Sequence, residues 1–248
     1  MTDSAATLWL LTGFVLSLFG LAWLSRQISH HIQLPVYYLT RSKDAPALAI
    51  FLVFLPGVIV HEAAHWGMAR LLGLRTGKFR VWPKRQGRHI GLGSVSVESR
   101  GPLLDSLVGI APLLAGSVLV AWIGNQVFAA YDLAGSLAQG QIVEGFQAFR
   151  RALGEPDGVL WAYLLFAIAN AMMPSASDRE PVKPVLLYAG VAVLLYVLLG
   201  MPLRPLTTLM QWTTPALQTL SSALLFTIVL DVIALAALYL IRLLVAHK

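Results

Sequence analysis

The chain has 248 residues, of which 57% are hydrophobic and only 12% are charged, so we expect an integral membrane protein rather than a soluble domain. It contains no cysteine, which excludes disulfides and thiolate metal sites and leaves histidine and carboxylate side chains as candidate metal ligands. The net charge is +6, but no basic face is interleaved with aromatic side chains, so nucleic acid is not an expected partner.

Six apolar segments have about the length needed to cross a lipid bilayer as helices. They are Leu8–Leu24, Ala47–Leu72, Leu103–Ala129, Val159–Pro174, Val185–Met201 and Leu217–Val245. No basic residue precedes the first segment, so it is expected to be a retained span rather than a cleaved signal peptide. The predicted fold class is an all-α polytopic membrane protein, with residues 1–248 forming one integral membrane domain.

The region around the start of the second span contains two local signals. His30 and His31 lie in the connector before it; neighbouring residues point apart on a helix or strand, so an interfacial connector is favoured over a metal site. Asp44 and Pro46 are typical of a helix start. Pro56 lies within the span and is expected to bend it.

The second span contains the sequence His61-Glu62-Ala63-Ala64-His65. On a helix, the two histidines lie four residues apart and face the same way. Two imidazoles one turn apart can hold a single Zn²⁺ with room for a third ligand, and Glu62 can accept a proton from a water there. Ionisable side chains in hydrocarbon are costly, which favours this function over histidines that only hydrogen-bond to their neighbours.

Residues 73–100 are basic and rich in glycine, and apolar residues alternate with polar ones at three places. This predicts a small β-hairpin or sheet after the histidine-bearing helix, with a turn at Pro83–Gly87. Two roles stay open for it: a lid without special chemistry, or a surface that holds an extended substrate by pairing with its edge. The alternating pairs are Phe79 with Val81, Ile90 with Leu92, and Val95 with Val97.

The third span begins near Asp105, which is expected to be a cap or an interfacial charge. The connector at residues 130–157 repeats apolar residues at helical spacing from Ile142 to Leu153, which predicts an amphipathic helix on the membrane surface. The span itself carries small residues that favour close helix packing. These are Gly109, Ala111, Ala115, Gly116 and Ser117.

Two carboxylates are candidates for a third metal ligand. Asp178 follows the fourth span, beyond Pro174, where the chain can turn its carboxylate back into the membrane. The competing interpretation is an interfacial aspartate paired with Arg179 or Lys183. Asp231 lies near the middle of the last span and is a functional candidate by default, as an alternative ligand, a partner for a polar group or a protonated packing residue.

The orientation follows from the placement of the basic residues. The segment from Arg70 to Arg100 carries the densest group of the 18 lysines and arginines, and its only acid is Glu98. By the positive-inside rule the 73–100 loop is predicted to be cytoplasmic. Six spans put the two termini on one side, so both termini are also predicted to be cytoplasmic. Asp178 then lies on the same side as the histidines, which favours it over Asp231.

The histidine box, the basic β-rich segment and the stretch from Asn170 to Asp178 together resemble the site-2 protease family of intramembrane zinc metalloproteases. In that family's second motif an Asn is followed eight residues later by the ligand Asp, a spacing that Asn170 and Asp178 keep. The resemblance covers residues 47–180, a catalytic core flanked by helices at 8–24, 185–201 and 217–245. The chain departs from the family by having Ser177-Asp178-Arg179 in place of Leu-Asp-Gly, which indicates a divergent branch.

The resemblance implies that His61, His65 and Asp178 hold one Zn²⁺ per chain, that Glu62 is the general base and that Asn170 helps to stabilise the oxyanion. The implied reaction is hydrolysis of peptide bonds in a transmembrane protein substrate that unwinds locally near the cytoplasmic face. Two alternatives remain: a membrane metalloprotease with Asp231 as third ligand, and a pseudoprotease that binds membrane proteins without cutting them. Six histidines are too few for the clusters of a di-iron hydroxylase.

Overall fold

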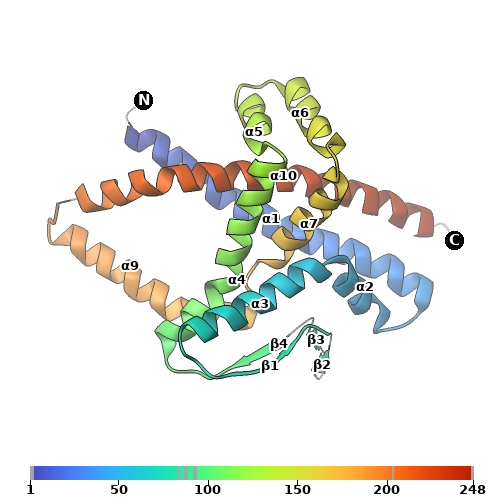
Figure 1. Cartoon of the computed structure of the whole chain (residues 1–248), viewed down its shortest axis with the longest axis horizontal. Coiled ribbons are helices and arrows are strands. Elements are labelled where there is room, and N and C mark those ends of the chain that lie inside the picture. The colour runs from blue at the N-terminus through green and yellow to red at the C-terminus, as the bar shows by residue number, and fades with distance from the viewer. Residues whose placement is uncertain (1–2, 83, 87–88, 92–93, 203, 247–248) are drawn as a thin grey trace.

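The computed structural model describes residues 3–82, 84–86, 89–91, 94–202 and 204–246, and most of them are helical (Figure 1). Within the described residues, four helices are long and apolar enough to cross a membrane, or up to six if each of two bent helix pairs is one span. The prediction of a helical chain with several candidate spans is confirmed to this extent. The helices are α1 (Asp3–Thr40), α2 (Ala45–Val53), α3 (Leu55–Leu71), α4 (Pro102–Trp122), α5 (Ala130–Ala138), α6 (Ile142–Gly154), α7 (Gly158–Ala171), α8 (Ala176–Arg179), α9 (Val182–Leu198) and α10 (Arg204–Ala246).

The first helix is longer than the sequence predicted. It continues through His30 and His31 to Thr40, so the expected connector at this place is wrong. Polar residues interrupt the hydropathy after the first apolar segment, but one apolar face persists because Ile28 and Ile32 are buried against α2 and the start of α3. An apolar face of this kind is enough to keep a helix packed although its other faces are polar.

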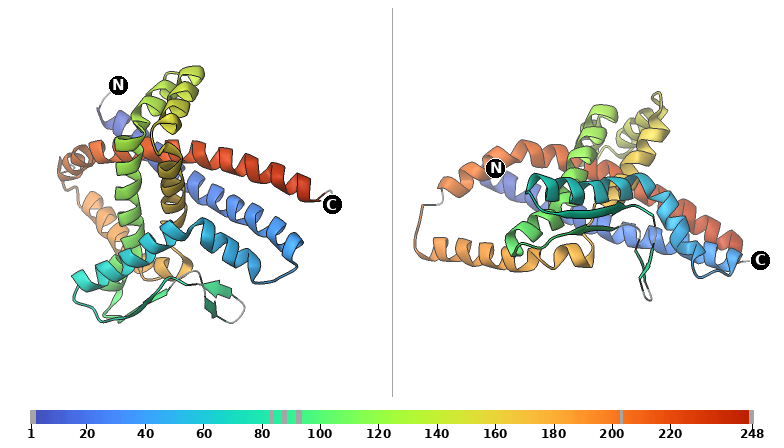
Figure 2. Two further views of the ribbon diagram at one scale, coloured as in Figure 1. Left: turned by 45° about the vertical axis from the view of Figure 1, so that its right-hand side comes forward. Right: turned by 60° about the horizontal axis from the view of Figure 1, so that its bottom comes forward.

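The long helices α1 and α10 lie side by side across the middle of the molecule (Figures 1 and 2). Gly20 faces Ile228, and the ring of His31 lies 6.1 Å from that of Tyr239. From the first contact to the second, the residue numbers increase along both helices, so α1 and α10 are parallel. If both cross a membrane, the start of α1 and the end of α10 emerge on opposite sides, so the structure does not support the prediction that the two termini share a side.

The second predicted span is broken into α2 and α3, which are bent by 78° relative to each other. Pro56 is the second residue of α3, where its missing N–H costs no helical hydrogen bond, so the predicted bend is confirmed. Asp44 precedes α2 and Pro46 is its second residue, which confirms the predicted helix start.

The chain between α3 and α4 forms two small antiparallel sheets, as expected for residues 73–100. Strand β1 (Thr76–Arg80) pairs with β4 (Ser94–Val97), and β2 (Lys84–Gln86) pairs with β3 (His89–Gly91). The predicted turn at Pro83–Gly87 is wrong for its middle three residues, because Lys84–Gln86 is itself a strand. Pro83, Gly87 and Leu92 lie outside the described residues. Strands β1 and β4 lie along α3 (Figure 1).

Helix α4 crosses the α1 and α10 pair and packs against α3 and α7 (Figures 1 and 2). A methyl group on Gly116 would come 2.4 Å from Cβ of Met172, so the predicted small-residue face does permit close packing. The five-residue π-helix Ile123–Val127 continues α4. The predicted helix at 142–153 is present as α6, although Phe149 on it is buried rather than free for a membrane surface.

Candidate metal centre

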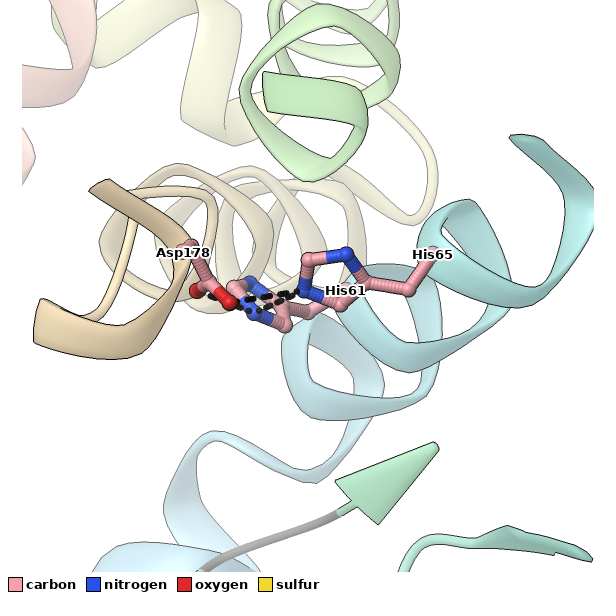
Figure 3. Close-up of side chains that lie close together, drawn as sticks. All are labelled: His61, His65 and Asp178. Atoms are coloured by element: carbon pink, nitrogen blue, oxygen red, sulfur yellow. Dashed lines mark hydrogen bonds and ion pairs between the residues drawn. The ribbon is translucent and has the colours of Figure 1, made fainter. Parts of the chain in front are cut away.

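Three potential metal ligands converge where α3 meets α8 (Figure 3). His61 and His65 project from successive turns of α3, and their Nε2 atoms are 3.2 Å apart. The carboxylate of Asp178 faces both rings, with Oδ2 at 3.5 Å from Nε2 of His61 and Oδ1 at 3.4 Å from Nε2 of His65. The structure therefore brings together all three of the metal ligands that the sequence predicted.

Backbone carbonyls on two other helices fix the orientation of both imidazole rings. Nδ1 of His61 donates to the carbonyl of Ala171 at 2.8 Å, and Nδ1 of His65 donates to the carbonyl of Val108 at 2.9 Å. A carbonyl can only accept, so each Nδ1 carries a proton, and each ring when neutral presents the lone pair of Nε2 to the shared space. Histidines that bind a metal through one ring nitrogen typically donate the N–H of the other ring nitrogen to an acceptor of this kind.

The three side chains are close enough together to hold a metal ion. One ligand atom from each of the three residues lies within 4.8 Å of the other two. The two Nε2 atoms are 3.2 Å apart, and each faces a different oxygen of the Asp178 carboxylate, at 3.5 Å for His61 and 3.4 Å for His65. Two nitrogen lone pairs and a carboxylate at these distances are stabilised by a positive charge among them. The three side chains are also largely shielded from solvent, with exposed fractions of 11–14%.

Asp178 is held in place by the start of its own short helix. Its Oδ2 accepts a hydrogen bond from the backbone N–H of Ser175, and its backbone N–H donates to Oγ of Ser175, so the two residues form a reciprocal capping box. Arg179 donates to the carbonyl of Ser175 instead of pairing with Asp178. The interpretation of Asp178 as an interfacial aspartate paired with Arg179 is therefore not what the structure shows.

Glu62 lies beside the ligands and is 8% exposed. It lines a cavity of about 800 Å³ that also contains the three ligands, Asn170 and the side chains of Val95 and Val97 from β4. The carboxylate lies near the backbone of Val95. A carboxylate beside three potential metal ligands, in a cavity of this size, can accept and donate a proton.

Asp105 borders the same cavity at the start of α4. Its carboxylate accepts hydrogen bonds from the hydroxyl of Ser99 and from the backbone N–H of Arg100. Gly101, not Asp105, is the N-cap of α4, so Asp105 lies in the first turn and bonds to residues that precede the helix. Asp105 does not belong to the metal-ligand cluster found among the described residues.

Asn170 and Asp231 form a separate polar pair next to the cluster. Nδ2 of Asn170 donates to Oδ1 of Asp231 at 2.9 Å and to the carbonyl of Phe166 at 2.9 Å. Asp231 is fully buried in α10 and is not part of the cluster formed by the histidines and Asp178. Of the three roles that the sequence left open for Asp231, the structure shows the partner of a polar group.

Sequence reasoning missed the residues that position the ligands. The carbonyls of Ala171 and Val108 leave no signal in a sequence, because every residue carries a carbonyl. The role of Ser175 was detectable in principle, since a serine three residues before an acidic residue matches the pattern of a capping box. That pattern predicts a helix start at Ser175 and a fixed carboxylate at Asp178.

Comparison with known proteins found no match: no family model, no curated protein and no solved structure is similar to this chain. The resemblance to site-2 proteases therefore rests on the motifs in the sequence.

Proposed function

We propose that this chain is an intramembrane zinc metalloprotease that hydrolyses peptide bonds in transmembrane protein substrates. The observation that carries the proposal is the convergence of His61, His65 and Asp178 beside the buried Glu62 in one cavity. Two imidazoles and one carboxylate form a ligand set used by catalytic zinc, which keeps a fourth position for water or substrate. Imidazole ligands also favour zinc over magnesium or calcium, which prefer oxygen.

When bound, zinc supplies a Lewis acid that polarises the scissile carbonyl and lowers the pKa of water at the site. Glu62 accepts the proton from the attacking water and then donates it to the nitrogen of the leaving amine. Burial of the site keeps bulk water away from both proton transfers. Asn170 lines the same cavity, and its proposed part in stabilising the oxyanion requires a rearrangement, because both amide hydrogens are donated to Phe166 and Asp231 in this structure.

The substrate is proposed to lie in the cavity as an extended segment along β4. A helix hides its carbonyls in its own hydrogen bonds, so a transmembrane segment must unwind before it is cut. Val95 and Val97 of β4 line the cavity, and β4 pairs with β1 alone in the described chain, so its second edge is available to pair with a peptide. Of the two roles that the sequence left open for this segment, the proposal is the surface that pairs with an extended substrate, not the simple lid.

The protein is proposed to lie in the cell membrane with the basic 73–100 loop on the cytoplasmic side, following the positive-inside rule. The cavity lies between this loop and the apolar helices, since its lining includes residues of β4, α3 and α7. Cleavage is therefore expected near the cytoplasmic face of the bilayer.

The test compares cleavage by the reconstituted wild-type chain and by Glu62→Gln, using a panel of single-span proteins whose spans contain helix-breaking residues. Glu62→Gln should retain zinc and lose cleavage by at least about 100-fold, because the proton acceptor is gone. Glu98→Gln is the matched control, since Glu98 also lines the cavity but is exposed, and it should cleave like wild type. Normal cleavage by Glu62→Gln would refute the general-base assignment, and a zinc-loaded wild type that cuts no substrate would favour the pseudoprotease alternative.

The position of the substrate is tested in the Glu62→Gln background with a photoreactive residue in place of Val95. Crosslinking of a cleavable substrate at this position is expected. A photoreactive residue in place of Tyr188, which is exposed on α9, should crosslink much less. Equal crosslinking at the two positions would contradict binding along β4.

A further inference from the structure

The buried carboxylate of Asp231 has no assigned role in the proposed reaction. It lies in the apolar helix α10 with no exposed surface. Its one hydrogen bond partner among the described residues is Asn170, which donates from Nδ2 to Oδ1. Burial of an aspartate in apolar surroundings is costly, and an apolar residue of similar size would fill the same space without that cost.

Asn170 connects Asp231 to the metal centre. The next residue, Ala171, is the last of α7, and its carbonyl accepts the Nδ1–H of His61. Carbonyls in the last turn of a helix have no partner within the helix, so their position depends on contacts with other elements. Asn170 supplies such contacts, because its side chain is bonded to Asp231 on α10 and its own carbonyl accepts a bond from the hydroxyl of Ser25 on α1.

The two histidines differ in their connection to Asp231. His65 donates to the carbonyl of Val108, which belongs to α4. That acceptor has no hydrogen bond connection to Asp231 in the described chain. A disturbance at Asp231 should therefore act on the ring of His61 directly and on the ring of His65 only through the contact between the two Nε2 atoms, so His65 should change less.

We propose that Asp231 is a positioning residue, which holds Asn170 and the end of α7 so that the carbonyl of Ala171 orients the imidazole of His61. This proposal rests on the proposed zinc site, because its functional consequence is weaker zinc binding by a misoriented His61. It makes the parallel pair of α1 and α10 part of the support of the metal centre. It also assigns Asp231 a role other than that of a metal ligand.

The first test needs no metal. Side-chain ¹⁵N NMR spectra of the full-length, metal-free protein in detergent report which ring nitrogen of each histidine carries the proton. In wild type, His61 and His65 should both be protonated at Nδ1. Asp231→Leu should mix the tautomers of His61 and change His65 clearly less, whereas Asp231→Asn keeps the acceptor oxygen and should leave both rings as in wild type.

Thr227→Val is the matched control. Thr227 is also a fully buried polar residue of α10, but its hydroxyl donates to the carbonyl of Ala223 within the same helix. This substitution should leave both histidines unchanged. An unchanged His61 in Asp231→Leu, or equal changes in both rings, would overturn the proposal.

A compensating pair keeps the proposal testable if Asp231→Leu does not fold. Asn170→Asp alone places two carboxylates together and removes the donor, so the tautomers of His61 should mix. The double substitution Asn170→Asp with Asp231→Asn restores one donor and one acceptor and should return His61 to the wild-type state. Failure of the double substitution to do so, with the single substitution folded, would contradict the proposed contact.

Competition with a chelator then measures zinc affinity in the same proteins. Asp231→Leu should bind zinc about tenfold more weakly than wild type, the lower end of the usual effect of residues that support metal ligands. If wild type binds no zinc, the proposed function fails while the NMR result still decides the role of Asp231. If wild type binds zinc and Asp231→Leu binds it equally well, the positioning role is refuted and the proposed function stands.

Discussion

Gly109 of α4 lies directly against the backbone of Asp178: a methyl group at this glycine would come 2.3 Å from the carbonyl oxygen of Asp178. The third metal ligand can therefore reach the histidines only because α4 carries no side chain at this position. The close approach also places Val108, the residue before Gly109, where its carbonyl accepts the hydrogen bond from His65. One glycine thus allows α4 to contact two ligands of the proposed site.

Gly109→Ala should displace Asp178 and weaken zinc binding. Overpacking of this kind costs about 1–3 kcal/mol, which corresponds to about 5- to 150-fold in affinity if all of it falls on the site. Chelator competition measures the effect. Gly190→Ala is the control, because Gly190 also lies inside a helix and has open space around it, so its zinc affinity should not change. Equal affinity of Gly109→Ala and wild type would contradict the described contact.

Ser175→Ala should also weaken zinc binding, since it removes one of the two capping hydrogen bonds that hold α8 and Asp178. Loss of such a cap costs about 1 kcal/mol, or about fivefold in affinity. Ser175→Thr keeps the hydroxyl and should bind zinc like wild type. Ser136→Ala removes an exposed serine whose hydroxyl bonds only within α5, and it serves as control. The explanation fails if Ser175→Thr and Ser175→Ala lose the same affinity.

The sequence predicts contacts between residues that are close together in the chain more firmly than contacts between residues that are far apart in it. His61 and His65 were predicted to converge because helix geometry alone places them on one face. Asp178 and Asp231 could not be separated with certainty, because the choice depends on how the chain turns between the end of α7 and α8. That turn is shaped by Ser175, which matches a local capping-box pattern, and by the packing of α4, which no local pattern encodes.

The architecture around the site was predicted less well for a related reason. The extension of α1 beyond Leu24 was missed because hydropathy averages over all faces of a helix, whereas packing needs one apolar face, here Ile28 and Ile32. The direction of α10 relative to α1 was also missed. Counting spans assumes that every apolar segment crosses the bilayer, but the second segment is a bent helix pair and the fourth is the second half of another bent pair, α6 with α7.

The parallel arrangement of α1 and α10 makes a prediction about topology. A reporter placed before Asp3 and one placed after Ala246 should report opposite sides of the membrane. Near the shared end of the two helices, Arg41 and Lys43 follow α1 and Arg242 lies in the last turns of α10, so the C-terminal reporter should be cytoplasmic. If α4 and α9 also cross, one of the two bent helix pairs crosses the membrane. The other pair is then a re-entrant segment, which returns to the side from which it entered. Both reporters on one side would mean that α1 or α10 does not cross.

The most direct test of the central claim is the zinc-to-protein ratio of the detergent-purified chain, measured for wild type, Asp178→Ala and Asp231→Ala. With His61, His65 and Asp178 as ligands, wild type should contain about one zinc per chain after supplementation. Asp178→Ala should contain almost none, and Asp231→Ala should retain zinc at saturating concentration. A wild-type ratio near zero after zinc supplementation, or retention of zinc in Asp178→Ala with loss in Asp231→Ala, would contradict the proposed metal centre.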